Sequence, residues 1–296
     1  MIDATGPFVS VVIPTYNHAR FLGRALQSVL DQTYTNWEAI VIDNHSQDNT
    51  DEVVDSFRDP RITLLKIHNN GVIAASRNMG IRAAKGEWIA FLDSDDWWTP
   101  NKIQVCLEQI NDKVDLVYHS LKLVSETPIF LRRKTIKSWQ VKTPVIIDLL
   151  VDSNPITNSS VVVRKSLLDR IGGIDENAGM VASEDYNTWL RIAQITDSFY
   201  YIPYTLGAYT AHEASISKKD MSVPSRYACA DFMHLLNDKQ QFKLESNLRF
   251  TKGQFAFTSG DYRVARNDFL FCIRHGNVFI KIKSLFMLIS SITMIR

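Results

Sequence analysis

Short apolar runs alternate with helical patterns along the first half of the chain, and this alternation limits the folds open to it. The runs are rich in β-branched and aromatic residues, as strands are, and lie at residues 9–13, 39–42, 62–67, 88–92 and 116–119. Between them, helical patterns cover residues 21–30 and 73–84, follow Thr50, and follow Thr99-Pro100, where a capping residue precedes proline. Alternating strands and helices imply βαβ units, so we predict an α/β fold with a Rossmann-like, mostly parallel sheet flanked by helices.

The pattern changes after Glu126. The stretch 126–155 is loose and locally basic, with Arg132, Arg133, Lys134, Lys137 and Lys142. We expect one more strand at residues 158–163 and a helix at 186–195. From about Met221 the pattern is helical. We therefore expect an α/β domain over residues 1–220 and a helical C-terminal region over 221–296.

Composition excludes some classes of partner. The 296 residues carry 33 Lys+Arg against 32 Asp+Glu, so no overall charge favours nucleic acid. The three cysteines form no paired or metal-binding pattern, which fits a reducing, cytoplasmic setting. The N-terminal residues lack a basic segment followed by an apolar run, so we predict no secretory signal.

The segment from Val278 to Arg296 is mostly apolar, with Lys281 and Lys283 near its start. Its uncharged part, Ser284 to Ile295, has 12 residues, whereas a helix that spans a bilayer needs about 20. The segment is too short to span on its own. It fits either a helix lying in a membrane interface or a buried terminal helix, and periodicity does not separate the two.

Acidic residues gather after the strand at 88–92. Asp93-Ser94-Asp95-Asp96 places three carboxylates within four residues, where they repel one another. A hard divalent cation such as Mg²⁺ or Mn²⁺ would relieve that repulsion. An isolated cluster would be read as a solvated turn. Here it follows an apolar strand, and ligands of parallel sheets bind beyond the carboxyl ends of their strands.

Five stretches, in this order, resemble the family 2 glycosyltransferases with the GT-A fold. They are Val11–Asn17 (VVIPTYN), Val41–Asn44 (VIDN), Ala74–Gly80 (AASRNMG), Gly86–Asp96 (GEWIAFLDSDD) and Ser183–Tyr186 (SEDY). The resemblance covers roughly Phe8 to Ser217. One departure is His45, which stands where the family usually has glycine, a residue better suited to positive φ.

The resemblance implies a role for each matching residue. Those expected to bind the nucleotide-diphosphate sugar donor are Pro14, Thr15, Tyr16, Asp43, Arg77, Asp93 and Ser94. Asp95 is the expected ligand of Mn²⁺ or Mg²⁺, with Asp96 as a second candidate. Asp185 is expected to be the base that activates the acceptor, and Glu184 to support it or contact acceptor hydroxyls. Without the resemblance, Glu184 and Asp185 would be ordinary acids at a helix start.

Three further features have two interpretations each. His212 resembles a late histidine of the family, near the metal or the phosphates, although a lone histidine is more often structural. Trp97 and Trp98 either stack on the acceptor side of a sugar or pack over the sheet edge. The basic stretch at 132–142 is either a solvated surface or attracts a phosphate-bearing, lipid-linked acceptor at a membrane.

We therefore predict an inverting, metal-dependent transfer of a sugar to an acceptor hydroxyl in the assembly of a cell-surface polysaccharide or glycolipid. The acceptor would be a saccharide or a lipid-linked saccharide. The setting would be cytoplasmic, with peripheral contact to the cytoplasmic membrane face. The alternative is a nucleotide-sugar-binding protein without turnover, which the intact acidic cluster and base disfavour. A dinucleotide-dependent oxidoreductase is also disfavoured, because no GxGxxG follows the first strand.

Overall fold

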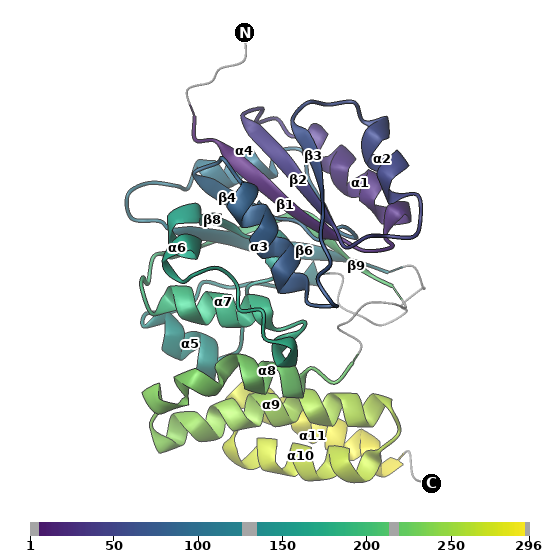
Figure 1. Cartoon of the computed structure of the whole chain (residues 1–296). Helices are drawn as coiled ribbons and strands as arrows, with labels where there is room; N and C mark the ends of the chain where they lie inside the picture. Colours follow the sequence, from purple (N-terminus) through teal and green to yellow (C-terminus); the bar gives the residue numbers. More distant parts are fainter. Residues whose placement is uncertain (1–5, 126–134, 213–218, 294–296) are drawn as a thin grey trace. The chain divides into compact units, whose positions relative to one another are not determined.

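A computed structural model describes residues 6–125, 135–212 and 219–293 (Figure 1). Within it the chain divides into two compact units, each drawn from several segments. Unit 1 comprises the chain up to Val141, Pro155–Ala178 and Gln194–His212. Unit 2 comprises Lys142–Asn154, Gly179–Ala193 and the chain beyond His212.

Unit 1 is built on a single sheet. Among the described residues its nine strands follow the order β3-β2-β1-β4-β8-β6-β9-β5, with β7 paired to β6. They are β1 (Val9–Thr15), β2 (Trp37–Asp43), β3 (Ile62–Lys66), β4 (Trp88–Phe91), β5 (Trp97–Trp98), β6 (Leu116–Ser125), β7 (Thr135–Ile136), β8 (Val162–Arg164) and β9 (Phe199–Ala211). The longer ladders, which join β1 to β2 and β4, β2 to β3, and β6 to β9, are parallel. The predicted α/β fold with a mostly parallel sheet is confirmed.

Helices cover both faces of this sheet. Consecutive residues of a strand point to opposite sides, and those of β1 are mostly apolar and are buried on both sides. Val11 of β1 belongs to a core that also holds Leu22 of α1 (Ala19–Leu30). The next residue, Val12, faces α3 (Ile73–Ala83) at Gly80. A Cβ at Gly80 would lie 2.6 Å from Val12 Cγ1, so only glycine lets α3 approach this closely. The close packing fixes the part of α3 that carries Arg77.

The other helical elements of unit 1 are short. They are α2 (Thr50–Ser56), α4 (Lys102–Leu107), α6 (Lys165–Arg170) and the 3₁₀ turn η1 (Asn158–Ser160), with a second 3₁₀ turn, η2 (Ala178–Met180), where the chain leaves unit 1. The predicted strand at 158–163 is therefore wrong in its first half. Asn158, Ser159 and Ser160 form a turn in which Ser160 N donates to Thr157 O at 3.0 Å.

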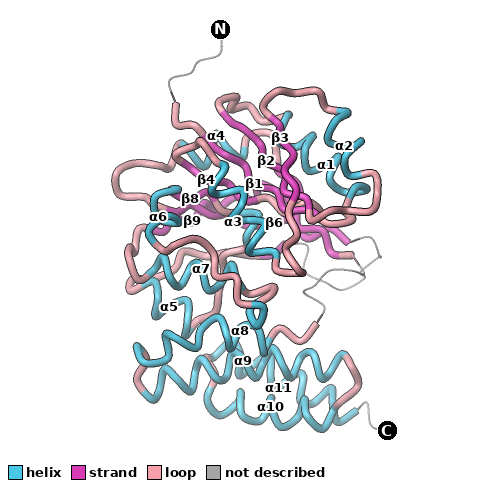
Figure 2. Tube along the Cα trace, viewed as in Figure 1, coloured by secondary structure: helices cyan, strands magenta, loops and turns pink. Residues whose placement is uncertain are grey.

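Among its described residues unit 2 contains helices joined by loops and no strand, as the cyan and pink segments of Figure 2 show. Its elements are α5 (Val145–Val151), α7 (Glu184–Ala193), α8 (Ser222–Cys229), η4 (Ala230–Leu235), α9 (Asp238–Thr258), α10 (Tyr262–His275) and α11 (Val278–Thr293). The last three pack together around Phe250, Phe269 and Ile280. No helix in the described ranges has the length and apolarity needed to cross a bilayer.

Candidate active site

The carboxyl ends of β1 and β2 lie side by side, with Thr15 and Asp43 paired in register. Asp43 is fully buried, and its two carboxylate oxygens accept from Ser46 N, both at 3.1 Å. Lys66 Nζ donates to the same carboxylate at 2.7 Å. Asp43 is thus held in a fixed orientation before any ligand arrives.

The end of β1 carries the other residues expected to bind the donor base. Pro14 is buried within the strand. The Thr15 hydroxyl is buried and has no hydrogen-bond partner within the described part of the chain. Tyr16 is 52% exposed, which is unusual for a large aromatic side chain at the edge of a packed sheet. The exposed ring of Tyr16 is open to stack on a nucleobase, whereas the Thr15 hydroxyl is a buried polar group without a partner among the described residues.

The turn after Asp43 contains the departure noted at His45. The residue adopts φ of +52°, in the left-handed region where glycine would be unstrained. Its ring stacks on that of His68, with centroids 3.8 Å apart and planes 16° from parallel. The stack stabilises a turn that the backbone alone disfavours.

Arg77 of α3 and Asp93 form an ion pair beyond the carboxyl end of β4. Arg77, only 3% exposed, donates from Nη2 to Asp93 Oδ1 at 2.7 Å. Asn158 Nδ2 donates to the same oxygen at 3.0 Å, and Asp93 N donates to Ser159 Oγ at 3.1 Å. Asp93, just after β4, is therefore bonded both to Arg77 of α3 and to the turn η1, and the sequence pattern did not reveal the bonds to η1.

Asp95 meets His212 from the end of β9. His212 Nε2 and Asp95 Oδ2 lie 3.0 Å apart. The side chain of His212 is 1% exposed and that of Asp95 is 18% exposed. Burial and the neighbouring Asp93 raise the pKa of Asp95 above its ordinary value, while the hydrogen bond with His212 opposes that shift. A bound cation would stabilise the ionised form of this carboxylate.

Asp96 and Ser94 point elsewhere. Asp96 is 1% exposed and accepts from the backbone N–H of Thr210 at 2.9 Å, which anchors β9. Burial, together with Asp95 and Asp93, raises the pKa of Asp96 well above the usual range. Ser94 Oγ lies 3.0 Å from Nδ1 of His18. Of the two candidate metal ligands in the cluster, Asp95 is the more accessible.

The donor set of Asp95 and His212 fits a divalent ion. A carboxylate oxygen and an imidazole nitrogen together suit Mn²⁺, and the carboxylate also suits Mg²⁺. In residues 6–125, 135–212 and 219–293, no three carboxylate, imidazole or thiol groups come together as a complete metal site. An ion held here would need further ligands, such as diphosphate oxygens and water.

The two tryptophans after the acidic cluster occupy different environments. Trp98 is 2% exposed, belongs to the core and donates from Nε1 to Ser159 O at 2.7 Å. Trp97 is half-buried, and the guanidinium of Arg24 lies 5.8 Å from its ring centroid. Packing accounts for Trp98, so Trp97 is the better candidate for contact with a sugar.

Glu184 and Asp185 begin α7, in unit 2. Glu184 is buried, whereas Asp185 is half-buried and accepts from Tyr186 N at 2.7 Å. Their assigned roles come from the resemblance. In the basic stretch, Lys137 and Lys142 are exposed, while Arg132, Arg133 and Lys134 lie outside the described residues.

Two polar residues near the acidic cluster were not predicted from the sequence, one in α1 and one at its N-cap. His18, the residue before the helix, contacts Ser94 and stacks edge-on against His212 with centroids 5.5 Å apart. Arg24 donates from Nη2 to Asp95 O and to Thr210 Oγ1, both at 2.8 Å. Both polar residues follow VVIPTYN, His18 directly before α1 and Arg24 within it, and α1 is apolar on its other face, which is the signal that was available.

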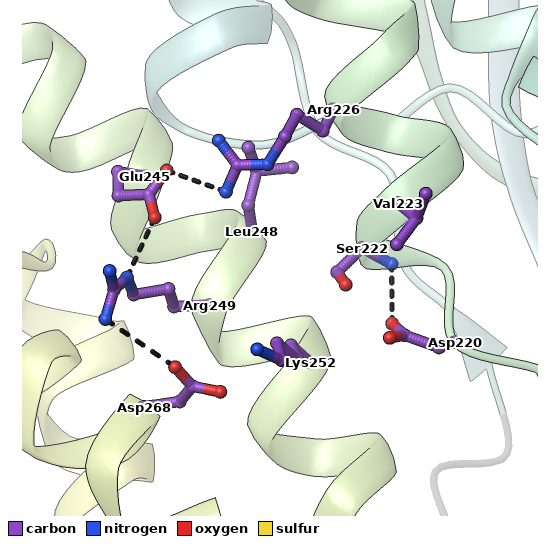
Figure 3. A pocket seen from close by; sticks show the side chains of 9 residues that line it. All are labelled: Asp220, Ser222, Val223, Arg226, Glu245, Leu248, Arg249, Lys252 and Asp268. Atoms are coloured by element: carbon purple, nitrogen blue, oxygen red, sulfur yellow. Dashed lines mark hydrogen bonds and ion pairs between the residues drawn. The ribbon is translucent and has the colours of Figure 1, made fainter. Parts of the chain in front are cut away.

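A separate pocket of about 280 Å³ lies in unit 2 (Figure 3). A chain of ion pairs lines it, running from Arg226 through Glu245 and Arg249 to Asp268. Burial alone would raise the pKa of Glu245, but hydrogen bonds from Arg249 and Arg226 outweigh burial and lower it. The opposite charges satisfy one another, so we assign this pocket a structural role.

Comparison with known proteins places these features in a family. Residues 10–171 match the family described as Glycosyl transferase family 2. The UDP-Glc:alpha-D-GlcNAc-diphosphoundecaprenol beta-1,3-glucosyltransferase WfgD of Escherichia coli is 31% identical over 185 residues, which cover 62% of this chain and 69% of that protein. The glycosyltransferase GlyG of Streptococcus pneumoniae is 41% identical over 107 residues, and the chain spans only 36% of its length.

Two solved structures share the fold at low sequence identity. TarS 1–349 of S. aureus in complex with UDP superposes with a TM-score of 0.65 at 17% identity, covering 96% of this chain and 88% of that one. The mannosyltransferase PcManGT of Pyrobaculum calidifontis, in complex with GDP-Man and Mn²⁺, gives a TM-score of 0.63 at 17% identity, covering 99% and 82%. The expected GT-A fold is confirmed.

Proposed function

The chain belongs to glycosyl transferase family 2, and from this membership we propose that it transfers a sugar from a nucleotide diphosphate to an acceptor hydroxyl, with inversion and with the help of a divalent ion. The observation that carries the proposal is the approach of Asp95 to His212 beyond the end of β4, beside residues suited to a nucleotide. In this reading Thr15, Tyr16 and Asp43 bind the base and ribose.

The remaining residues beyond the carboxyl end of β4 and around it act on the diphosphate and the sugar. Arg77 and Asp93, with Ser94 nearby, orient the donor through their ion pair. Asp95 and His212 would hold a Mn²⁺ or Mg²⁺ ion, which when bound neutralises charge on the departing nucleotide diphosphate. Trp97 offers an aromatic surface to a sugar. Asp96 keeps β9, and with it His212, in place.

Inversion requires a base on the acceptor side. The diphosphate leaves from one face of the sugar, so a single displacement brings the acceptor oxygen to the opposite face. A neutral hydroxyl is a weak nucleophile, and a carboxylate that takes its proton speeds the attack. We assign this task to Asp185, with Glu184 in support, because the resemblance gives this acidic pair that role and we assign Asp93 and Asp95 to the donor.

We propose a lipid-linked saccharide as acceptor, presented at the cytoplasmic face of a membrane during the assembly of a polysaccharide or glycolipid. The name of WfgD describes transfer onto a diphosphoundecaprenol-linked sugar. One structural neighbour was solved with UDP and another with GDP-Man, so the tests below use both nucleotides.

The test of the metal site is Asp95→Asn, which removes one charge at nearly constant shape. Affinities for UDP and GDP are measured with and without Mn²⁺. We expect Mn²⁺ to strengthen nucleotide binding to the wild type. The variant should lose roughly 10- to 100-fold of that gain, the range found when metal-site partners are altered. Asp55→Asn, the same change at an exposed position on α2, should leave the gain intact.

An unchanged Mn²⁺ effect in Asp95→Asn would exclude Asp95 as a ligand. The alternative function, nucleotide-sugar binding without turnover, is tested separately by incubating the wild type with UDP- and GDP-sugars and a diphospholipid-linked saccharide. Product formation excludes that alternative. Tight donor binding without product under all these conditions would favour it.

A further inference from the structure

The last helix of the described chain, α11, exposes a continuous apolar face. Its members are half or more exposed, with values from 50% to 75%: Val278, Phe279, Ile282, Leu285, Phe286 and Ile289. At 3.6 residues per turn these positions fall within an arc of roughly 120°. We call these six residues the apolar face of α11. Such a continuous exposed patch marks an interaction site more often than scattered apolar residues do.

The opposite side of α11 is used for packing within unit 2. Ile280 is buried in the core with Phe269, and Met287 and Leu288 pack against that core. Arg266 of α10 donates from Nη2 to Ser291 O at 2.8 Å. The helix is therefore fixed by one side, and its apolar face is not the side that stabilises the fold.

Positive charge borders the apolar face on both sides. Successive residues of a helix are about 100° apart, which places Lys281 next to one margin of the arc and Lys283 next to the other. The Lys283 ammonium lies 4.1 Å from the ring centroid of Phe279. No acidic residue follows Asp268 in the sequence, whereas Arg274 and His275 precede α11. The side chains of residues 269–296 therefore include lysines and arginines but no carboxylates.

We propose that the apolar face of α11 docks on an anionic lipid surface, with the helix lying in the membrane interface. Helices bind in this way when apolar residues enter the headgroup region and flanking lysines reach phosphates. A second copy of the chain suits the surface less well, because a self-complementary contact would bring Lys281 and Lys283 of both copies to one interface without an acidic residue of α11 to pair them. The inference does not depend on the transfer reaction.

Sedimentation with vesicles tests the proposal on the full-length protein. The vesicles contain either phosphatidylcholine alone or phosphatidylcholine with 30 mol% phosphatidylglycerol. We expect the protein to sediment with the anionic vesicles and to be released by high salt more readily than by low salt. The double substitution Ile282→Gln with Phe286→Gln should weaken binding roughly a hundredfold, since it removes two side chains that would be buried in lipid. Lys281→Gln should weaken it roughly fivefold.

The control is Val223→Gln, which changes a side chain with 54% exposure on α8 and should leave vesicle binding unchanged. Circular dichroism checks that all variants melt at the temperature of the wild type, as expected for exposed positions. The proposal is overturned if the wild type stays in the supernatant with anionic vesicles, or if the double variant binds them equally well. It is also overturned if the wild type is a dimer that binds no vesicles and that the double variant makes monomeric.

Discussion

Lys102 places its amine in the core of unit 1, and this residue makes the free energy of unfolding depend on pH. Its side chain is completely buried, its Nζ lies 3.8 Å from the ring centroid of Trp98, and Nζ has no hydrogen-bond partner among the described residues. Burial lowers the pKa of Lys102 from 10.5 to about 8. Between these two values the unfolded chain binds more protons than the folded chain, so the free energy of unfolding rises with pH across that window.

We therefore expect Lys102→Met to be more stable than the wild type at pH 7, by up to about 3 kcal/mol at 1.36 kcal/mol per unit of pKa shift. The difference should shrink as the pH is raised from 8 toward 10, where the wild-type amine is neutral. Urea unfolding at pH 7 and pH 9.5 measures both effects. Lys85→Met, at a side chain that is 79% exposed, should show neither. Parallel pH profiles for the wild type and Lys102→Met would contradict the assignment.

At the scale of elements, the position of α3 on the sheet depends on Gly80, a residue that has no reactive side chain. Gly80 closes the stretch AASRNMG, and an added Cβ would lie 2.6 Å from Val12 Cγ1 and 2.7 Å from Ile42 Cδ1. Gly80→Ala should therefore push α3 off the sheet and lower the free energy of unfolding by about 1–3 kcal/mol, the usual cost of overpacking. Urea unfolding of the variant measures this loss.

Gly23 in α1 is the matched control for Gly80. An added Cβ there would meet Val53 Cγ1 at an ordinary 3.8 Å. Because alanine favours helices over glycine, Gly23→Ala should raise the free energy of unfolding by about 0.5–1 kcal/mol. If the two substitutions changed stability in the same direction, close packing would not be the reason for glycine at position 80.

The elements that sequence predicted well are those whose patterns are local. The first four strands and the helices between them carry their own apolar periodicity, and each was found. The strand β9 was missed because Pro203 interrupts it, and proline argues against an inner strand. The structure places this interruption at a register shift, where Ile202 pairs with His119 and Thr205 with Ser120.

The consequences of β9 for the candidate site were equally hidden. His212 reaches Asp95 only because β9 runs parallel to β6 and ends beside the acidic cluster. That pairing joins residues far apart in sequence, so no local pattern encodes it. The resemblance supplied His212 as a candidate, while its contact, and those of Asn158 and Arg24, required the structure.

At the scale of the whole molecule, the chain passes between the two compact units several times. Segments 142–154 and 179–193 belong with the C-terminal helices, although the segments that flank them, up to residue 141, 155–178 and 194–212, belong to unit 1. The boundary that we predicted near residue 220 marks where the helical pattern begins. That it also separates two functional domains stays a prediction. Unit 1 holds the candidates for donor and metal binding, and Asp185 belongs to unit 2. From these assignments we expect donor binding and transfer to be separable by mutation.

Substitution of Asp185, the proposed base, should separate donor binding from transfer most clearly. Asp185→Asn should leave the Mn²⁺-dependent affinity for UDP or GDP nearly unchanged, because the residues assigned to the donor all lie in unit 1. Transfer should fall by roughly 10²- to 10⁴-fold, the usual contribution of a general base. If Asp185 only stabilised the start of α7, its loss would cost about 0.3–1 kcal/mol of stability and spare turnover. Asp238→Asn, at an exposed acid in the first turn of α9, measures that smaller effect. Near-normal turnover in Asp185→Asn would reject the base, and a product whose anomeric configuration by NMR equals that of the donor would reject inversion itself.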